Sequence, residues 1–586
     1  AVSRIAATSA GPCVTLGLWQ LTRSPSRYTQ LALLVVMAAA VGTFAATYGE
    51  TTDRSQEDRA LYSAGSDIRL TGIGRLASGF SEDAPGKLEE VPGVERAMTA
   101  TRTVMSIGPL PNFGAQVDIL GLQPAVAGEV AWWRDDFATQ DIDGVLARIQ
   151  GSPIQDHGIL LPGEPAAVSL WVNPVAPRPG TTLWLRSRDA NGIFRFHEFG
   201  LLDFEGYKRL EARLNAQAIG AVYPMSVVGV FMTQVESIGE ETRTVLFDDL
   251  GAVTTDGRET IVDDFESGFR WDVLRTATRD RDEVSQVGQG THRGAGAAAF
   301  AFKTGIGVPI RGMSVSDPNI PVPAVASRYF MERTGLKIGG EVELVFGKLL
   351  MPVTIQGVVD YFPTMYNNDA GYIIVNQDHL FYYAGMSSER ATQSTPTEAW
   401  LTLTKDPKAR EEAQAAFLDR YGIPGSQIID SQVILEEIRT DPVVRAGGSG
   451  ILLVALIAAF AILALGFALT LYLGGQARTV EVSVMRAVGI SPRQLFTMIS
   501  LEYLLIAAIG LIIGTIAGLR ISATMLSFLN VTEEGDTVIP EFALVTRWDT
   551  VAIAFAAVGV AFVVGVLALA VYFLRLPVSR VIRLTR

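Results

Sequence analysis

The chain has 586 residues, 48% of them hydrophobic, with a mean hydropathy of +0.28 and a formal charge of -13. This length exceeds the roughly 250–300 residues at which a single hydrophobic core stops growing, so several domains are expected. The hydrophobic excess lies in a few runs near the two ends, which indicates a membrane protein with a large polar insert. The single cysteine, Cys13, excludes a disulfide framework within the chain and any paired-cysteine metal or redox site.

Four apolar segments are long enough to cross a membrane, which takes about 20 mostly apolar residues. They are residues 28–48, 451–473, 495–519 and 551–573. The alternative, buried helices of a large soluble protein, fits poorly with three such runs after residue 450. We therefore predict four transmembrane helices.

The placement of arginine predicts the orientation of these spans. Residues 1–27, 474–494 and 574–586 together contain ten arginines and one acidic residue, Glu481, a net charge of +9. The whole-chain charge of -13 then leaves -22 for the remainder. The positive-inside rule puts the three basic segments, including both termini, in the cytoplasm. Residues 49–450 and the shorter loop 520–550 are then extracytoplasmic, and the expected location is the cell (cytoplasmic) membrane.

The large outer region has two kinds of pattern. Residues 49–157 and 304–446 alternate short helices with strands, which predicts an α+β domain split in two by an insert. Residues 158–303 instead show short strands separated by turn residues at intervals of about 8–12, which is typical of a β-sandwich. The predicted fold class is thus a multi-pass α-helical membrane protein with a large α+β extracytoplasmic domain that carries an inserted, jelly-roll-like β-sandwich.

Two segments of the insert, residues 244–250 (TVLFDDL) and 261–271 (IVDDFESGFRW), resemble jelly-roll modules of the carbohydrate-binding type. Their paired acids are Asp248, Asp249, Asp263 and Asp264. Carboxylates are the hard oxygen ligands that Ca²⁺ prefers, so one interpretation is a structural calcium site. The other is that these acids cap turns and face water.

The segment between the second and third spans carries the most specific pattern. Residues 478–489 (RTVEVSVMRAVG) predict a short amphipathic helix that ends at Gly489. Ser491 is expected to cap the third span, with Pro492 in its first turn. A helix held between two spans at the cytoplasmic surface is well placed to contact a cytoplasmic partner.

This segment resembles the FtsX/MacB-like permease family of ABC transporters. The residues that fit the family's loop pattern are Arg478, Glu481, Arg486, Ala487, Gly489, Ser491 and Gln494. Glu502 stands where the family often has a membrane glutamate. The span order and two outer stretches (VPGVERA and GLKIGGEVELVFG) fit as well, so the resemblance covers residues 20–157 and 303–586. The inserted sandwich departs from the minimal family pattern, so the substrates of smaller members do not carry over.

The resemblance implies a partner, a cytoplasmic ABC ATPase bound through the loop helix, and a second permease copy or homologous half. The sequence contains no GxxxxGK[ST] phosphate loop, so ATP is expected to be hydrolysed only by that partner. The chain begins with Ala1, and residues 1–27 look like a linker between spans. Three alternatives stay open: a complete chain, a processed chain, and the second half of a longer two-repeat permease.

Two features of the third span concern packing and charge. Gly510, Gly514 and Gly518 recur every four residues, a spacing that lets another helix approach closely, within this chain or across a dimer. A carboxylate inside a membrane is costly and usually paired. We expect Glu502 to pair with Arg478 or Arg486 and to fix the loop helix.

Other chemistries find little support. The histidines are isolated from one another, at His157, His197, His292 and His379, and no catalytic frame accompanies them, so the chain is not expected to be an enzyme. The acidic soluble part disfavours nucleic-acid binding. Trp171 and Trp184 lie at alternating strand positions that usually face a core, which disfavours sugar stacking.

The leading hypothesis is a permease subunit that acts on a lipid, lipoprotein, peptide or cell-envelope substrate, with membrane lipids around its spans. The alternative is a non-transporting receptor or accessory subunit whose sandwich binds glycan or cell wall.

Overall fold

The computed structural model describes residues 25–73, 84–108, 114–151, 158–234, 241–276, 282–303, 310–315, 321–387, 395–440, 451–477, 484–485, 489–529 and 537–575. The chain divides into two compact units. One is formed by Ala1–Ala60 and Gln432–Arg586, and the other by Leu61–Ser431.

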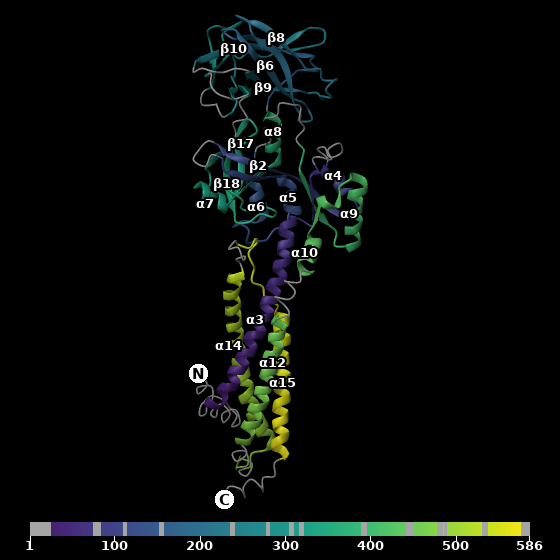
Figure 1. Ribbon diagram of the computed structural model, residues 1–586, viewed down its shortest axis with the longest axis vertical. Helices are drawn as coiled ribbons and strands as arrows, with labels where there is room; N and C mark the ends of the chain where they lie inside the picture. Colours follow the sequence, from purple (N-terminus) through teal and green to yellow (C-terminus); the bar gives the residue numbers. More distant parts are fainter. Residues whose placement is uncertain are drawn as a thin grey trace. The chain divides into compact units, whose positions relative to one another are not determined.

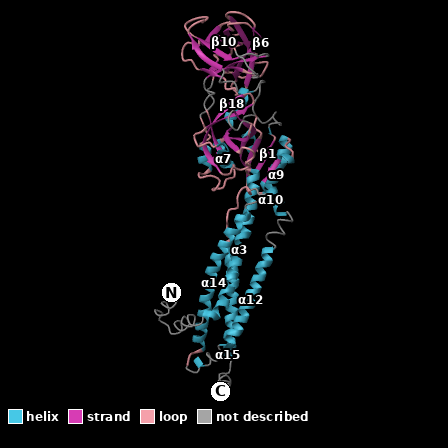
Figure 2. Cartoon of the chain, turned by 60° about the vertical axis from the view of Figure 1, so that its left-hand side comes forward, coloured by secondary structure: helices cyan, strands magenta, loops and turns pink. Residues whose placement is uncertain are grey.

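The first unit is a bundle of long helices (Figures 1 and 2). Its members are α3 (Pro25–Ala64), α12 (Ile451–Ala477), α14 (Pro492–Leu529) and α15 (Trp548–Arg575). Among the residues that the structure describes, three stretches are long and apolar enough to cross a membrane: Thr29–Ala64, Phe496–Met525 and Trp548–Gly565. In α12 the apolar stretch found among the described residues is shorter, Ile457–Leu469. The structure thus gives three candidate spans where the sequence predicts four.

Buried side chains from all four helices form the bundle core. Leu31 and Val35 of α3 lie in one cluster with Phe467 of α12, Tyr503 of α14 and Phe562 of α15. The Phe467 and Phe562 rings stack with centroids 5.3 Å apart, and the edge of Tyr503 meets Phe562 at 6.2 Å. This contact set fixes which face of each helix turns inward.

The second unit contains a nine-stranded sheet in the order β17-β18-β16-β19-β3-β2-β20-β1-β21, and β17 also pairs with β2. Its strands are β1 (Ile68–Thr71), β2 (Val94–Gly108), β3 (Gln116–Leu122), β16 (Val322–Ser327), β17 (Glu341–Phe346), β18 (Leu349–Val359), β19 (Tyr372–Asn376), β20 (Glu398–Leu403) and β21 (Ile428–Asp430). Strands from before the predicted insert (β1, β2 and β3) lie between strands from after it, and β20 separates β2 from β1. The two flanks therefore fold as one α+β domain.

Helices cover both faces of this sheet. They are α4 (Ala84–Glu89), α5 (Pro124–Val130), α6 (Ile142–Ala147), α7 (Arg328–Thr334), α8 (Gln377–Ser387) and α9 (Pro407–Tyr421). The next helix, α10 (Ser431–Thr440), belongs to the other unit from its second residue on. Because successive strand residues point to opposite faces, Val325 packs with α5 and α6 whereas Ala324 packs with α7 and α8. Helix α7 begins after Ser327, whose hydroxyl accepts from the Phe330 amide, and it ends at Gly335, which has a φ of 71°.

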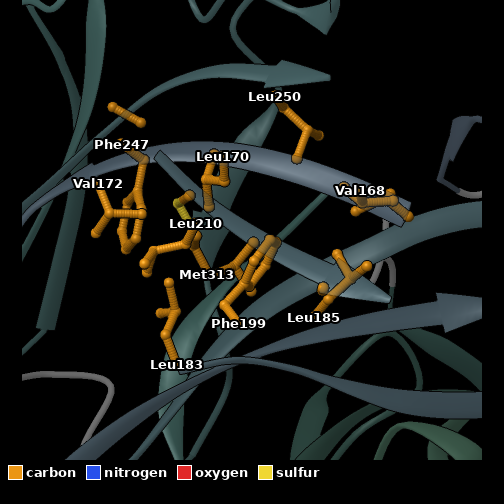
Figure 3. Close-up of a cluster of buried hydrophobic side chains, with 14 of the residues drawn as sticks. Val168, Leu170, Val172, Leu183, Leu185, Phe199, Leu210, Phe247, Leu250 and Met313 are labelled. Atoms are coloured by element: carbon orange, nitrogen blue, oxygen red, sulfur yellow. The ribbon is translucent and has the colours of Figure 1, made fainter. Parts of the chain in front are cut away.

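The insert is a sandwich of two six-stranded sheets, β13-β14-β10-β5-β8 with β11, and β12-β15-β9-β6-β7 with β4. The strands are β4 (Ile159–Leu160), β5 (Ala167–Asn173), β6 (Arg178–Arg188), β7 (Phe194–Leu202), β8 (Lys208–Arg213), β9 (Ser226–Gln234), β10 (Thr242–Val253), β11 (Glu259–Asp263), β12 (Trp271–Val273), β13 (Asp282–Val287), β14 (Ala297–Lys303) and β15 (Arg311–Val315). Figure 3 shows side chains from both sheets meeting in its core, among them Leu170, Phe247, Leu183 and Met313.

One predicted boundary needs correction. The sandwich does not end at residue 303, because β15 pairs with β9 and β12 and contributes Met313 and Val315 to the sandwich core. The strand is only five residues long and follows a segment without a strand pattern, so its alternation alone was too short to assign it.

Candidate functional site

The residues that lead into α14 make contacts typical of helix ends. Gly489 has a φ of 100°, and the Ile490 amide donates to the Met485 carbonyl at 3.1 Å, which is the pattern of a Schellman helix end. The Ser491 amide donates to Oε1 of Gln494 at 3.0 Å, and the Gln494 amide donates to Oγ of Ser491 at 3.3 Å. These reciprocal bonds form a capping box. The predicted turn at Gly489 and the cap at Ser491 are both present, and they give Gln494 a local structural role.

The charged residues of the predicted coupling helix lie outside the described residues. They are Arg478, Glu481 and Arg486, together with Ala487. Glu502, on α14, is fully buried in the helical unit beside Tyr503. Its pairing with Arg478 or Arg486 therefore stays a prediction.

The glycine stripe of α14 faces α3 of the same chain. A Cβ atom on Gly514 would lie 2.5 Å from Cβ of Ala39 and 2.6 Å from the Val36 carbonyl oxygen. A Cβ on Gly518 would lie 2.6 Å from the Ala40 carbonyl oxygen, and one on Gly510 would lie 2.8 Å from Val35. No real side chain tolerates such distances, so the two backbones are in direct contact along this stripe.

Sequence reasoning missed a second set of contacts in the helical unit, between α3 and the segment before α15. Oγ1 of Thr51 donates to the Val545 carbonyl at 3.0 Å and accepts from the Val545 amide at 3.1 Å. Thr47 bonds to Thr546 at 3.1 Å, and Arg547 forms an ion pair with Glu50. The run of threonines on α3 is the only sequence signal for this contact, because nothing in the 537–547 segment has a regular pattern.

Most of the acids proposed as calcium ligands accept hydrogen bonds from other groups of the same chain. Asp248 Oδ2 accepts from the amides of His292 at 2.7 Å and Arg293 at 3.2 Å. Asp263 accepts from the Phe265 amide at 2.9 Å and from Trp271 Nε1 at 3.0 Å.

The remaining two acids of that set differ from each other. Asp264 caps the turn at Glu266, whose amide donates to it at 2.9 Å. Asp249 is buried with a φ of 44°, and its pKa is raised by burial and by the charge of Asp248. Within the described ranges no group of three or more His, Cys, Asp or Glu side chains is arranged to hold a metal. The calcium site stays a prediction.

The histidines and tryptophans are distributed over separate environments. His197 lies in the sandwich and His379 in α8, whereas His157 falls outside the described residues. Trp184 is partly buried and its Nε1 donates to Thr233, as expected for a residue packed on a core. Trp171 does not point into the sandwich core but stacks on His292, with ring centroids 3.7 Å apart.

Taken together, the apolar helices and the β-rich unit define a membrane protein with a large β-rich domain. The family model described as FtsX-like permease C-terminal matches residues 452–578, which span most of α12, all of α14 and all of α15. This part of the chain is similar to the FtsX-like permease C-terminal domain, which supports the predicted resemblance to the FtsX/MacB-like permease family. No curated protein matches the chain.

Proposed function

We propose that the chain is the transmembrane subunit of an ABC transporter. In this proposal it has four spans with both termini in the cytoplasm, and a separate ATPase binds the segment between α12 and α14. ATP hydrolysis by that partner moves the extracytoplasmic domain, which acts on a lipid, lipoprotein, peptide or cell-envelope substrate. A second permease copy completes the working unit.

The observation that carries the proposal is the match of residues 452–578 to the FtsX-like permease domain, a family that generally works with a cytoplasmic ABC ATPase. Two further observations support it. The capping box at Ser491 and Gln494 holds the start of α14 in a defined geometry, which suits a segment that must transmit force. The sequence has no phosphate-binding loop of its own, so nucleotide chemistry requires another chain.

Co-purification tests this proposal. The full chain is isolated in a mild detergent, and mass spectrometry identifies the proteins bound to it. We expect an ATPase with a phosphate-binding loop to accompany the wild type and to be lost with Arg486→Glu. Arg580→Glu is the matched control, because it makes the same charge change in the C-terminal tail and should retain the partner. Absence of an ATPase from all three preparations would contradict the proposal and favour the receptor or accessory-subunit alternative.

A further inference from the structure

A pocket of about 460 Å³ lies in the α+β domain, at the carboxyl ends of the parallel strands β16 and β18. It is bounded by α6 on one side and by α7 and the residues after it on the other, and these elements are labelled close together in Figure 1. Its volume is within the range of about 300–1,000 Å³ that is usual for small-molecule sites.

The interior of this pocket is apolar. Val325 and Val145, exposed by only 1% and 4%, lie at its base, and Met331 and Leu336 line the α7 side. The base stays open because Gly357 has no side chain: a Cβ there would lie 3.2 Å from Val325 and 3.5 Å from Cδ of Arg148. Such a surface favours an aliphatic chain, since each methylene moved out of water stabilises binding by about 0.8 kcal/mol.

The mouth of the pocket combines a cation with an exposed apolar side chain. Arg148 donates from Nη1 to the Gln356 carbonyl at 2.9 Å and from Nε to Oε1 of Gln140 at 3.3 Å. Both acceptors are neutral, so they orient the guanidinium without neutralising its charge. Arg328, the other cation at the pocket, is already paired with Asp360. Glu332, an acid that also lines the pocket, interacts electrostatically with Arg328, so Arg148 is the cation that a ligand would meet. Ile338 is 62% exposed at the rim.

A fixed guanidinium beside an apolar cavity matches one chemical class. Guanidinium groups bind carboxylates and phosphates through parallel, charge-assisted hydrogen bonds. We propose that this pocket binds an amphiphile with a single aliphatic chain and a carboxylate or phosphate head, the chain between α6 and α7 and the head at Arg148. The proposal stands on the pocket itself and holds whether or not the chain is coupled to an ATPase.

Photo-crosslinking of the full chain in lipid nanodiscs tests this inference. The probe is a fatty acid with a diazirine on its chain, and mass spectrometry locates the labelled peptides. We expect label between residues 325 and 338 and between 356 and 358. The variants Arg148→Gln and Ile338→Glu should each reduce that label about tenfold, because each removes one of the two recognised features.

Matched controls separate local from general effects. Arg258→Gln and Leu418→Glu make the same changes at other exposed positions, where the Arg258 side chain is 86% exposed and Leu418 is 55% exposed, and should keep the wild-type label. All four substitutions are at exposed side chains, so the variants should fold.

Competition identifies the head group. An excess of decanoate or of decyl phosphate should remove the label, and whichever acts at lower concentration identifies the source as a fatty acid or a phosphate-headed lipid. Equal competition by decyltrimethylammonium, which has the same chain and a cationic head, would overturn the proposal. So would label that is confined to the membrane helices or that both pocket variants leave unchanged.

Discussion

At the scale of single residues, the sandwich contains a histidine that is held neutral. Nδ1 of His197 lies 3.2 Å from the Arg213 carbonyl oxygen, and Nε2 lies 2.8 Å from Oγ of Ser187. Because a carbonyl only accepts, Nδ1 carries the proton and Nε2 accepts from the serine hydroxyl. The pKa of His197 is lowered to about 4, mainly by burial; the hydrogen bond to the Arg213 carbonyl opposes this shift and the Arg195 charge adds to it.

This lowered pKa predicts that the sandwich loses stability in mild acid. Between pH 6.5 and 4 the unfolded chain takes up a proton at this position and the folded chain does not, so the free energy of unfolding falls by up to about 3 kcal/mol across that range. Calorimetric unfolding of the wild type and of His197→Gln at pH 7 and pH 4.5 measures the effect. The variant should lack this part of the pH dependence, and identical pH profiles would rule out the assignment.

A buried charge network in the α+β domain gives a second residue-scale prediction. Glu398, 5% exposed, accepts from Arg102 Nε at 2.8 Å, from Arg69 Nη1 at 3.4 Å and from Trp400 Nε1 at 3.1 Å. Burial would raise the pKa of Glu398, but the two arginines outweigh it and lower that pKa. Glu398→Gln leaves both cations without their counter-charge and should reduce the free energy of unfolding by about 3 kcal/mol.

Denaturant unfolding of the Glu398→Gln variant checks this value. Asp360→Asn is the control, since it breaks the more exposed pair with Arg328 and should cost at most about 1 kcal/mol. Equal losses of unfolding free energy in the two variants would show that the buried Glu398 network stabilises the fold no more than an exposed ion pair does.

Few of these residue-scale features could be predicted from the sequence. The cap at Ser491 could be predicted, because its bonding partner Gln494 is only three residues away in the sequence. Glu398 and Arg102 are separated by 296 positions, so no local pattern joins them. The same limit applies to Trp171, whose stacking partner His292 comes from a distant loop.

At the scale of elements, local pattern predicted an α+β region interrupted by the short, regularly spaced strands of a sandwich, and the structure has strands of this kind from β4 to β14. Two features exceeded what local pattern provides. The first predicted span is part of one continuous helix of 40 residues, α3, and β15 joins the sandwich from beyond its predicted end.

The direct contact of α14 with α3 leads to a prediction about the glycine stripe. Gly514→Val places a branched side chain where a Cβ alone is 2.5 Å from Ala39, so the two helices must separate. We expect a loss of stability of about 2 kcal/mol or more. Gly559→Val, on α15, is the matched control, because nothing lies within 4 Å of its Cβ position. Thermal unfolding in one detergent compares them, and equal midpoints would contradict the packing assigned to Gly514.

At the scale of the whole molecule, the sequence predicted the division into apolar helices and a large domain with an inserted sandwich. It did so because apolar runs and turn spacing are local signals that need no knowledge of long-range contacts. The orientation read from arginine placement stays a prediction. The ligand of the α6–α7 pocket was not predictable, since its lining comes from segments up to about 220 residues apart in the chain.

The predicted orientation can be tested with cysteine labelling. Cys13 is the natural cysteine and lies in a segment predicted to be cytoplasmic. In sealed right-side-out vesicles a membrane-impermeant maleimide should therefore spare Cys13 until the membrane is opened. Glu411→Cys, placed in a Cys13→Ser background at an exposed position of α9, should react at once. The reverse pattern would invert the proposed topology.

The central claim, that this chain transmits ATP hydrolysis by a partner, is tested most directly by the ATPase activity of the native complex in nanodiscs. We predict vanadate-sensitive hydrolysis with the wild-type chain and its loss with Arg486→Glu. Glu502→Gln should retain the partner but lower the rate, because the glutamate is predicted to fix the loop helix. Hydrolysis that is equal in all three complexes would contradict the coupling role of the segment between α12 and α14.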